Sequence, residues 1–215
     1  MRVYKIYLLL LLAAFPCSVR ATSANDTAET GKLLLVLGDS LTAGYGLAAE
    51  EAFPVQLEKA LRQAGYPVTV INAGVSGDTT AGGLARLSWA LADKPQLVIV
   101  ALGGNDALRG LPPEDTRSNL DAILRQLNDA GVRIILTGMR APRNLGEQYT
   151  ATFDQVYPQL AKQHKVPFYP FFLDGVALDP VLNQPDGIHP NASGVAVIVA
   201  RILPVVETVL HSMRD

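Results

Sequence analysis

Cysteine is almost absent from the sequence. Cys17 is the only cysteine, and it lies in an apolar segment near the N-terminus. A single thiol forms neither an internal disulfide nor a thiolate metal site. If the N-terminal segment is removed, no cysteine remains in the mature chain, and a cysteine nucleophile is excluded as well. The chemistry of the chain must therefore depend on other side chains.

The chain also has few histidines and a small net charge. The chain has 3 histidines, and its 18 basic residues nearly balance 20 acidic ones, for a formal net charge of -2. No basic stripe emerges, so nucleic acid is not an expected partner. His164 and His211 fall on or at the end of predicted helices and are interpreted as solvent-facing residues without a role. Catalytic metal sites need a richer cluster of ligands, so we expect no metal site.

The longest unbroken apolar run lies near the N-terminus. Arg2 and Lys5 are followed by an apolar run of about ten residues, half of the roughly 20 that a membrane-spanning helix requires. This pattern predicts a signal peptide over residues 1–21, cleaved after Ala21, with Ala24 as an alternative site. The mature protein is then expected in the periplasm or secreted, without a transmembrane span.

The sequence disfavours two alternatives to a cleaved signal peptide. An uncleaved anchor is disfavoured because no stop-transfer pattern follows. Lipidation of Cys17 is disfavoured because Phe15 and Pro16 precede it, where small residues are usual. Residues 22–31 are then a short polar leader, and residues 32–215 are long enough for one well-buried domain but too short for two.

Short apolar runs alternate with longer amphipathic segments through this domain. Runs rich in Val, Ile and Leu are typical of parallel strands that are covered on both faces. The predicted strands are 33–37, 68–71, 97–102, 132–137 and 166–169. The predicted helices are 52–64, 80–92, 114–130, 149–164 and 192–211. This order predicts an α/β fold, a three-layer α/β/α sandwich around a five-stranded parallel sheet.

Polar, glycine-rich segments follow the predicted strands. In such sheets ligands bind outside the carboxyl ends of the strands, so these segments are the candidates for a site. They are 38–42 (GDSLT), 72–78 (NAGVSGD) and 103–106 (GGND), and a fourth, 186–190 (DGIHP), precedes the last helix.

Each segment alone has an explanation that needs no catalysis. Ser40 could cap a helix, because serine often satisfies free backbone N–H groups there. Gly77 could be a turn glycine, and Asn105 a turn former held by its own backbone. Asp186 and His189 could be a pair of metal ligands.

The combination of the segments favours acyl transfer. A serine hydroxyl such as that of Ser40 needs a base, and His189 can accept and return its proton. Asp186, three residues earlier, can reach the other ring nitrogen and fix its tautomer. The backbone N–H groups of Ser40 and Gly77 and the side-chain amide of Asn105 could stabilise an oxyanion, and losing one such donor typically costs ~2.7–4 kcal/mol.

The same segments resemble those of a known family, the GDSL or SGNH hydrolases, and within it the bacterial thioesterase I, lysophospholipase and arylesterase group. The matching motifs, in order, are 37–41 (LGDSL), 76–79 (SGDT), 102–106 (LGGND) and 186–190 (DGIHP). The family's four signature residues fall on Ser40, Gly77, Asn105 and His189, with the acid at Asp186. The resemblance extends from about Leu33 to the final helix.

The resemblance implies a flavodoxin-like SGNH hydrolase fold for the single domain, no cofactor, and hydrolysis of esters, thioesters or lysophospholipids. Asp39 and Asp106 are expected to brace the site through hydrogen bonds. Loops that form the substrate pocket vary in this family, so residues 139–146 and 171–183 leave the acyl-chain preference open. The expected partner is a small-molecule or lipid ester, and the chain is expected to be a monomer or weak oligomer.

The sequence lacks the motifs of several other enzyme classes, and two other functions remain as alternatives. The sequence has no G-x-S-x-G elbow, no phosphate-binding P-loop and no dinucleotide-binding glycine pattern. An acyltransferase with the same triad would differ only in the acceptor, and product analysis with a competing alcohol would separate it from a hydrolase. A non-catalytic lipid- or glycan-binding protein would keep ligand binding in Ser40→Ala and show no ester turnover.

Overall fold

The computed structural model describes residues 31–213. The predicted signal peptide, Cys17 and nearly all of the leader lie outside the described residues. At the centre of the fold is a five-stranded parallel sheet in the order β2-β1-β3-β4-β5. Its strands are β1 (Lys32–Gly38), β2 (Val68–Gly74), β3 (Leu97–Ala101), β4 (Arg133–Thr137) and β5 (Phe168–Tyr169).

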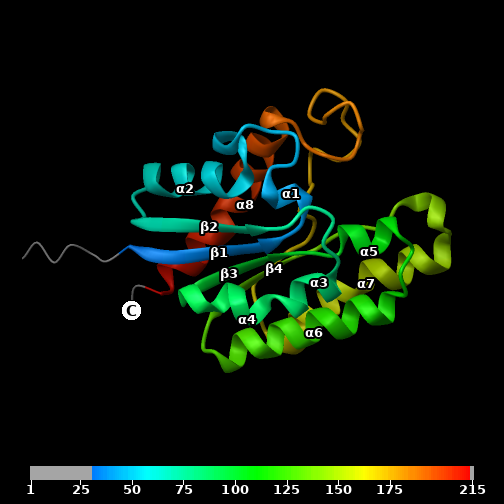
Figure 1. Cartoon of the computed structure of the whole chain (residues 1–215), viewed down its shortest axis with the longest axis horizontal. Helices are drawn as coiled ribbons and strands as arrows, with labels where there is room; N and C mark the ends of the chain where they lie inside the picture. The colour runs from blue at the N-terminus through cyan, green and yellow to red at the C-terminus, as the bar shows by residue number, and fades with distance from the viewer. Residues whose placement is uncertain (1–30, 214–215) are drawn as a thin grey trace, which may run out of the picture.

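Helices cover both faces of the sheet, which confirms the predicted α/β/α sandwich (Figure 1). On one face α2 (Phe53–Gln63) packs against α8 (Ala192–His211). On the other face α6 (Pro113–Asp129) packs against α7 (Glu147–His164) and against α3 (Thr80–Ala85). Shorter helices are α1 (Ser40–Ala43), η1 (Ala49–Glu51), α4 (Leu87–Ala90), η2 (Leu91–Asp93), α5 (Gly104–Leu108) and η3 (Arg143–Leu145).

The central strands are buried on both faces, as their unbroken apolar sequences predict. Every residue of β3 is fully buried, and so are most residues of β1. Helix α8 is long and apolar enough to cross a membrane. However, Ile198, Ile202 and Val206 on this helix are fully buried in the hydrophobic core of the domain. We therefore interpret α8 as a core helix of the sandwich.

The predicted helix 80–92 is wrong as a single element, because the chain forms α3, α4 and η2 instead. Glycine is a poor helix former, and α3 contains Gly82 and Gly83 in succession. A Cβ at Gly83 would meet a methyl group of Leu102, so a larger residue there would require that side chain to shift. The junction residue Arg86 binds carbonyl groups at the ends of β1 and β2. The predicted strand 166–169 is also too long, and only its last two residues form β5.

Candidate active site

The first three polar segments begin side by side at one edge of the sheet. The register pairs Gly38, the last residue of β1, with Gly74 of β2 and with Ala101 of β3. Gly74 has no room for a side chain, since a Cβ would lie 2.5 Å from the backbone nitrogen of Ala43. This close approach brings the segments that hold the candidate nucleophile and the candidate oxyanion donors to one rim.

Ser40 is the first residue of α1. The helix is capped by Asp39, whose Oδ1 accepts a hydrogen bond from the Leu41 N–H at 3.0 Å. The capping explanation for Ser40 is therefore wrong, because the neighbouring carboxylate takes that role. The Ser40 hydroxyl is left to form a different contact, and its Oγ lies 2.9 Å from Nε2 of His189, 149 residues away.

Asp186 holds the other side of the His189 ring. Its Oδ2 lies 2.7 Å from Nδ1, and its Oδ1 accepts hydrogen bonds from the N–H groups of His189 at 3.0 Å and Ile188 at 2.9 Å. These two backbone N–H groups, together with the imidazole, lower the pKa of Asp186 to about 2. An ionised Asp186 accepts the Nδ1 proton, which leaves Nε2 as the acceptor for the Ser40 hydroxyl.

Two backbone donors at this rim are free. Within residues 31–213, the N–H groups of Ser40 and Gly77 donate to no protein acceptor. Gly77 has a φ of 84°, a left-handed conformation that suits glycine. Asn105 lies in α5, and its Nδ2 donates to the carbonyl of Asp78 at 2.9 Å and to Oδ2 of Asp39 at 3.3 Å. Asn105 is thus held by two other segments, and the interpretation of a turn former held by its own backbone is wrong.

Two buried carboxylates brace these segments, as the sequence predicts for Asp39 and Asp106. Each is 1% exposed. Asp39 links α1 to Asn105. Asp106 accepts hydrogen bonds from the N–H and the hydroxyl of Thr80 at 2.9 and 2.5 Å, which links α5 to the start of α3. The segments around the candidate oxyanion donors are therefore linked to one another through the protein interior.

Two arginines near the rim were missed by the sequence analysis. Arg109 donates to the carbonyl oxygen of Gly77 at 2.7 Å and so orients the peptide next to the free N–H. Arg86 pairs with Asp78 at 2.6 Å. Arg109 follows Asn105 by four residues, one helical turn, but this spacing alone does not indicate which backbone carbonyl the arginine binds.

The ionised form of Asp39 is expected to reduce the stability of the fold. Burial raises its pKa from 3.8 to about 6, although hydrogen bonds from Leu41 and Asn105 oppose the shift. The folded state then holds the Asp39 proton more tightly than the unfolded state. This tighter binding contributes about 3 kcal/mol to the free energy of unfolding below about pH 4, and the contribution is lost as the pH rises through about 6.

Urea denaturation of wild type and Asp39→Asn between about pH 4 and 7 measures this contribution. The difference in unfolding free energy between the two proteins should change by about 3 kcal/mol across the window, with wild type losing more as the pH rises. Asp129→Asn, an exposed change of the same charge, should follow wild type. Parallel curves for wild type and Asp39→Asn would contradict the burial argument.

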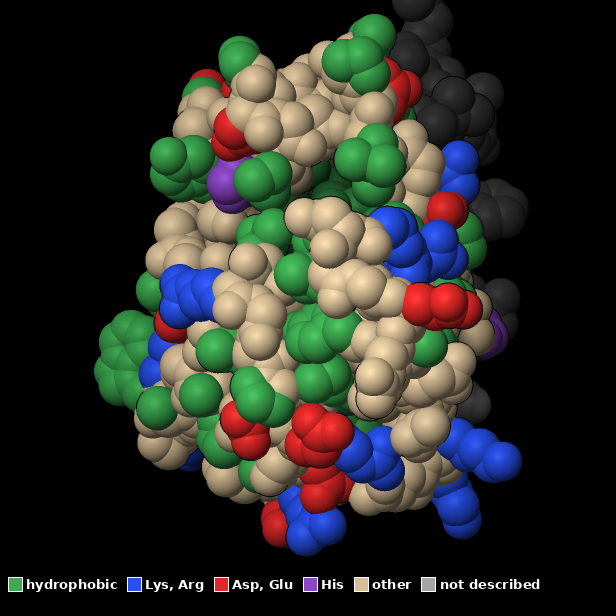
Figure 2. Space-filling view, turned by 90° about the vertical axis from the view of Figure 1, so that its right-hand side faces the viewer, with side chains coloured by type: hydrophobic (Ala, Val, Ile, Leu, Met, Phe, Trp, Pro, Cys, Tyr) green, Lys and Arg blue, Asp and Glu red, His purple; other side chains and the backbone are tan. Residues whose placement is uncertain are grey.

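A cleft of about 720 Å³ opens beside the Ser40 hydroxyl. Figure 2 shows this edge of the molecule, where a histidine and a group of Lys and Arg side chains lie on opposite sides of a hollow with hydrophobic side chains. Both segments expected to vary, 139–146 and 171–183, contribute to the walls. The lining includes Ser40, Asn105, Leu108, Met139, Arg140, Phe171, Leu173, Leu178, Ile188 and His189.

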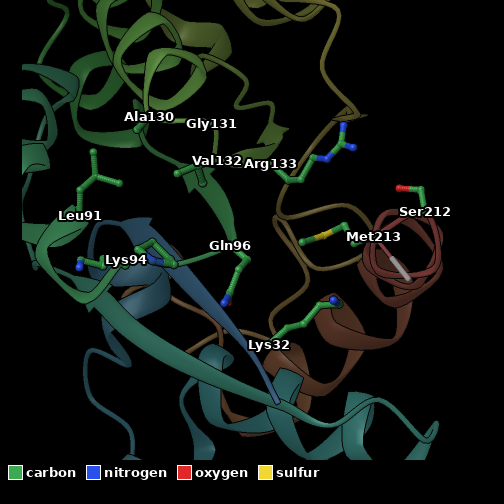
Figure 3. A pocket seen from close by; sticks show the side chains of 11 residues that line it. Lys32, Leu91, Lys94, Gln96, Ala130, Gly131, Val132, Arg133, Ser212 and Met213 are labelled. Carbon is green, nitrogen blue, oxygen red and sulfur yellow. The ribbon is translucent and has the colours of Figure 1, made fainter. Parts of the chain in front are cut away.

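A second cavity, of about 670 Å³, lies at the opposite edge of the sheet. Its lining includes Lys32, Gln96 and Arg133, which stand at or next to the amino ends of β1, β3 and β4 (Figure 3). None of the candidate catalytic residues lines it. The chemistry suggested by the sequence is therefore confined to the carboxyl edge.

The two other histidines, His164 and His211, do not line the active-site cleft. His211 is exposed at the end of α8. His164 is not solvent-facing, and that interpretation is wrong: its side chain is 8% exposed and its Nε2 lies 2.6 Å from Oδ1 of Asp121. The contact joins α7 to α6 across the layer, which the helical pattern of either segment alone does not reveal.

Comparisons with known proteins identify relatives of the chain. Residues 36–197 match the model of the GDSL-like lipase/acylhydrolase family. An arylesterase of Vibrio mimicus is 43% identical over 85% of the chain and 89% of that protein. Thioesterase 1/protease 1/lysophospholipase L1 of Escherichia coli is 43% identical over 86% of the chain and 83% of that protein. The crystal structure of AlinE4, an SGNH-hydrolase family esterase, superposes with a TM-score of 0.71 at 49% identity, covering 84% of the chain and 97% of that structure.

Proposed function

Since the chain belongs to the GDSL-like lipase/acylhydrolase family and is a carboxylic ester hydrolase, we propose that it cleaves esters through a covalent acyl-enzyme on Ser40. The observation that carries the proposal is the continuous contact from Ser40 Oγ to His189 Nε2 and from His189 Nδ1 to Asp186, at 2.9 and 2.7 Å. This arrangement matches what an activated serine nucleophile requires.

In the first half-reaction, Ser40 Oγ attacks the ester carbonyl carbon while His189 Nε2 takes the hydroxyl proton. The tetrahedral intermediate places its negative oxygen near the free N–H groups of Ser40 and Gly77. Asn105 Nδ2 supplies the third donor by exchanging its 3.3 Å contact with Asp39 for the oxyanion. The imidazolium then donates its proton to the leaving alcohol, the carbon–oxygen bond breaks, and the acyl group remains on Ser40.

In the second half-reaction, water replaces the alcohol. His189 removes a proton from water as the water oxygen attacks the acyl carbon, the same donors hold the oxyanion, and the proton returns to Ser40 as the acid leaves. Asp186 stays ionised throughout and stabilises the positive ring. The proposal includes lysophospholipids, because their acyl chain is held by an ordinary oxygen ester, and thioesters, because the same carbonyl chemistry serves a sulfur leaving group.

Export is part of the proposal and is supported by the basic and short apolar segments of residues 1–21. We propose that the mature enzyme acts in the periplasm or outside the cell. The cleft and its apolar lining remain available to a substrate in either place.

Covalent labelling tests the acyl-enzyme directly. A reactive alkyl phosphonate ester should attach once per chain, on the peptide that contains Ser40, and the loss of p-nitrophenyl ester hydrolysis should parallel the labelling, because a phosphonate mimics the tetrahedral intermediate. Mass spectrometry of the intact and digested protein measures both. A label on another residue, or full labelling with activity retained, would contradict the proposal.

A further inference from the structure

The wall of the active-site cleft carries an arginine without a charged partner. Arg140 lines the same cavity as Ser40 and His189. Within the described part of the chain, its guanidinium forms no ion pair and no hydrogen bond with another residue. Its N–H donors are therefore available to a ligand in the cleft.

The neighbouring charged side chains of the cleft are either paired with an opposite charge or buried. Arg143 pairs with Asp154 at 2.7 Å, and Asp174 pairs with Arg201 at 2.6 Å. The lining carboxylate Asp39 is 1% exposed and is bound within the protein. Arg140 is thus the uncompensated positive charge on this wall, and a negatively charged ligand group would be attracted to it.

Arg140 is also held in place before a ligand arrives. Its guanidinium carbon lies 4.7 Å from the centre of the Phe171 ring, a distance typical of a cation–π contact. The backbone on both sides is tied down, because the Phe172 N–H donates to the carbonyl of Gly138 at 2.9 Å and the Ala141 N–H donates to Asp154 at 2.9 Å. A guanidinium fixed in this way loses little side-chain freedom on binding.

The position suits the leaving group of the substrate rather than its acyl chain. Burying an arginine beside an acyl chain would remove water from the charge without replacing its hydrogen bonds. The apolar lining residues Leu108, Leu178 and Ile188 offer a better surface for the chain. Arg140 follows β4, two strands from β1, and neighbouring strands lie about 4.8 Å apart, so a group several bonds from the ester can reach it.

From these observations, and resting on the proposed ester hydrolysis at Ser40, we propose that Arg140 binds a phosphate group in the leaving part of the substrate. Guanidinium binds phosphate through paired, charge-assisted hydrogen bonds. The phosphate can belong to the glycerophosphate of a lysophospholipid or to coenzyme A. Arg140 would then determine the preference of the enzyme for phosphate-bearing esters over neutral ones.

Matched substrates isolate this interaction. The first pair is 1-octanoylglycerol 3-phosphate and 1-octanoylglycerol, and the second is octanoyl coenzyme A and octanoyl-N-acetylcysteamine. Each pair shares its acyl chain and its reacting bond and differs in the phosphate-bearing part. In Arg140→Gln, the ratio of kcat/KM for the phosphate-bearing member over the neutral one should fall about 10- to 100-fold, mainly through KM. The pair that shows the fall identifies the source of the phosphate.

Two further readouts separate phosphate binding from a structural effect. Added salt should raise the KM of wild type for the phosphate-bearing substrate, and this dependence should weaken in Arg140→Gln. Arg125→Gln, on the exposed side of α6, removes the same charge and should keep the ratio of wild type.

An unchanged ratio in Arg140→Gln for both pairs would overturn the inference while leaving the esterase proposal intact. Failure of wild type to hydrolyse any of the four substrates, or any p-nitrophenyl ester, would instead count against the proposed function itself. A ratio lowered equally in Arg125→Gln would also overturn the inference, because the effect would then come from net charge.

Discussion

Ser40→Ala is expected to lower kcat for p-nitrophenyl ester hydrolysis by about 10⁴- to 10⁶-fold. The substitution removes the one atom that forms the bond to the acyl group, and no other hydroxyl contacts His189 Nε2 among the described residues. The backbone N–H of residue 40 and the cap from Asp39 do not depend on the side chain, so the free oxyanion donors remain. The residual rate then reports the oxyanion donors and binding alone.

The measurement is steady-state hydrolysis of a p-nitrophenyl ester series from acetate to palmitate, which also reports the acyl-chain preference. Ser76→Ala is the matched control, since Ser76 is an exposed serine in another segment of the same rim. It should lose less than about tenfold. Equal rates in wild type and Ser40→Ala would rule out Ser40 as the nucleophile. If neither protein hydrolysed the esters but both still bound a ligand, the result would favour a non-catalytic binding protein.

The strands could be predicted from the sequence where both of their faces are buried. The strands β1, β3 and β4 are buried on both faces, so their apolar runs predict them to within a residue or two. The break between α3 and α4 was not predictable from helical spacing, because the junction residue Arg86 binds the carbonyl groups of Ala73 and Gly38 in other segments. Those contacts join distant segments and leave no periodic signal.

The candidate site was predictable for a different reason. Parallel strands place their carboxyl ends at one edge, so segments after β1, β2 and β3 must lie together. What the sequence did not show are the partners of the side chains that surround the Ser40, His189 and Asp186 contacts. Asp39 contacts Asn105, His164 pairs with Asp121, and Arg140 stacks on Phe171. These pairings come from opposite sides of a layer or loop, where sequence spacing carries no information.

Asp186→Asn is expected to lower kcat by about 10⁴-fold with little change in the loop. The amide oxygen of asparagine can still accept from the N–H groups of Ile188 and His189, as Oδ1 of Asp186 does at 2.9 and 3.0 Å. The amide nitrogen then faces His189 Nδ1 in place of Oδ2. An N–H donor there favours the tautomer with its proton on Nε2, and that nitrogen can no longer accept the Ser40 hydroxyl proton.

Stopped-flow and steady-state hydrolysis of p-nitrophenyl esters measure the loss, and ¹⁵N spectra of the histidine ring report the tautomer. Asp179→Asn is the matched control, because Asp179 caps a nearby turn through the Val181 N–H at 2.9 Å and has no contact with His189. It should keep activity within about threefold. A loss in Asp186→Asn without a change of tautomer would mean that the negative charge on Asp186 acts by stabilising the imidazolium. Full activity in the variant would remove Asp186 from the mechanism, and His189 would then be oriented by its contact with Ser40 and by the Tyr45 ring 4.6 Å away.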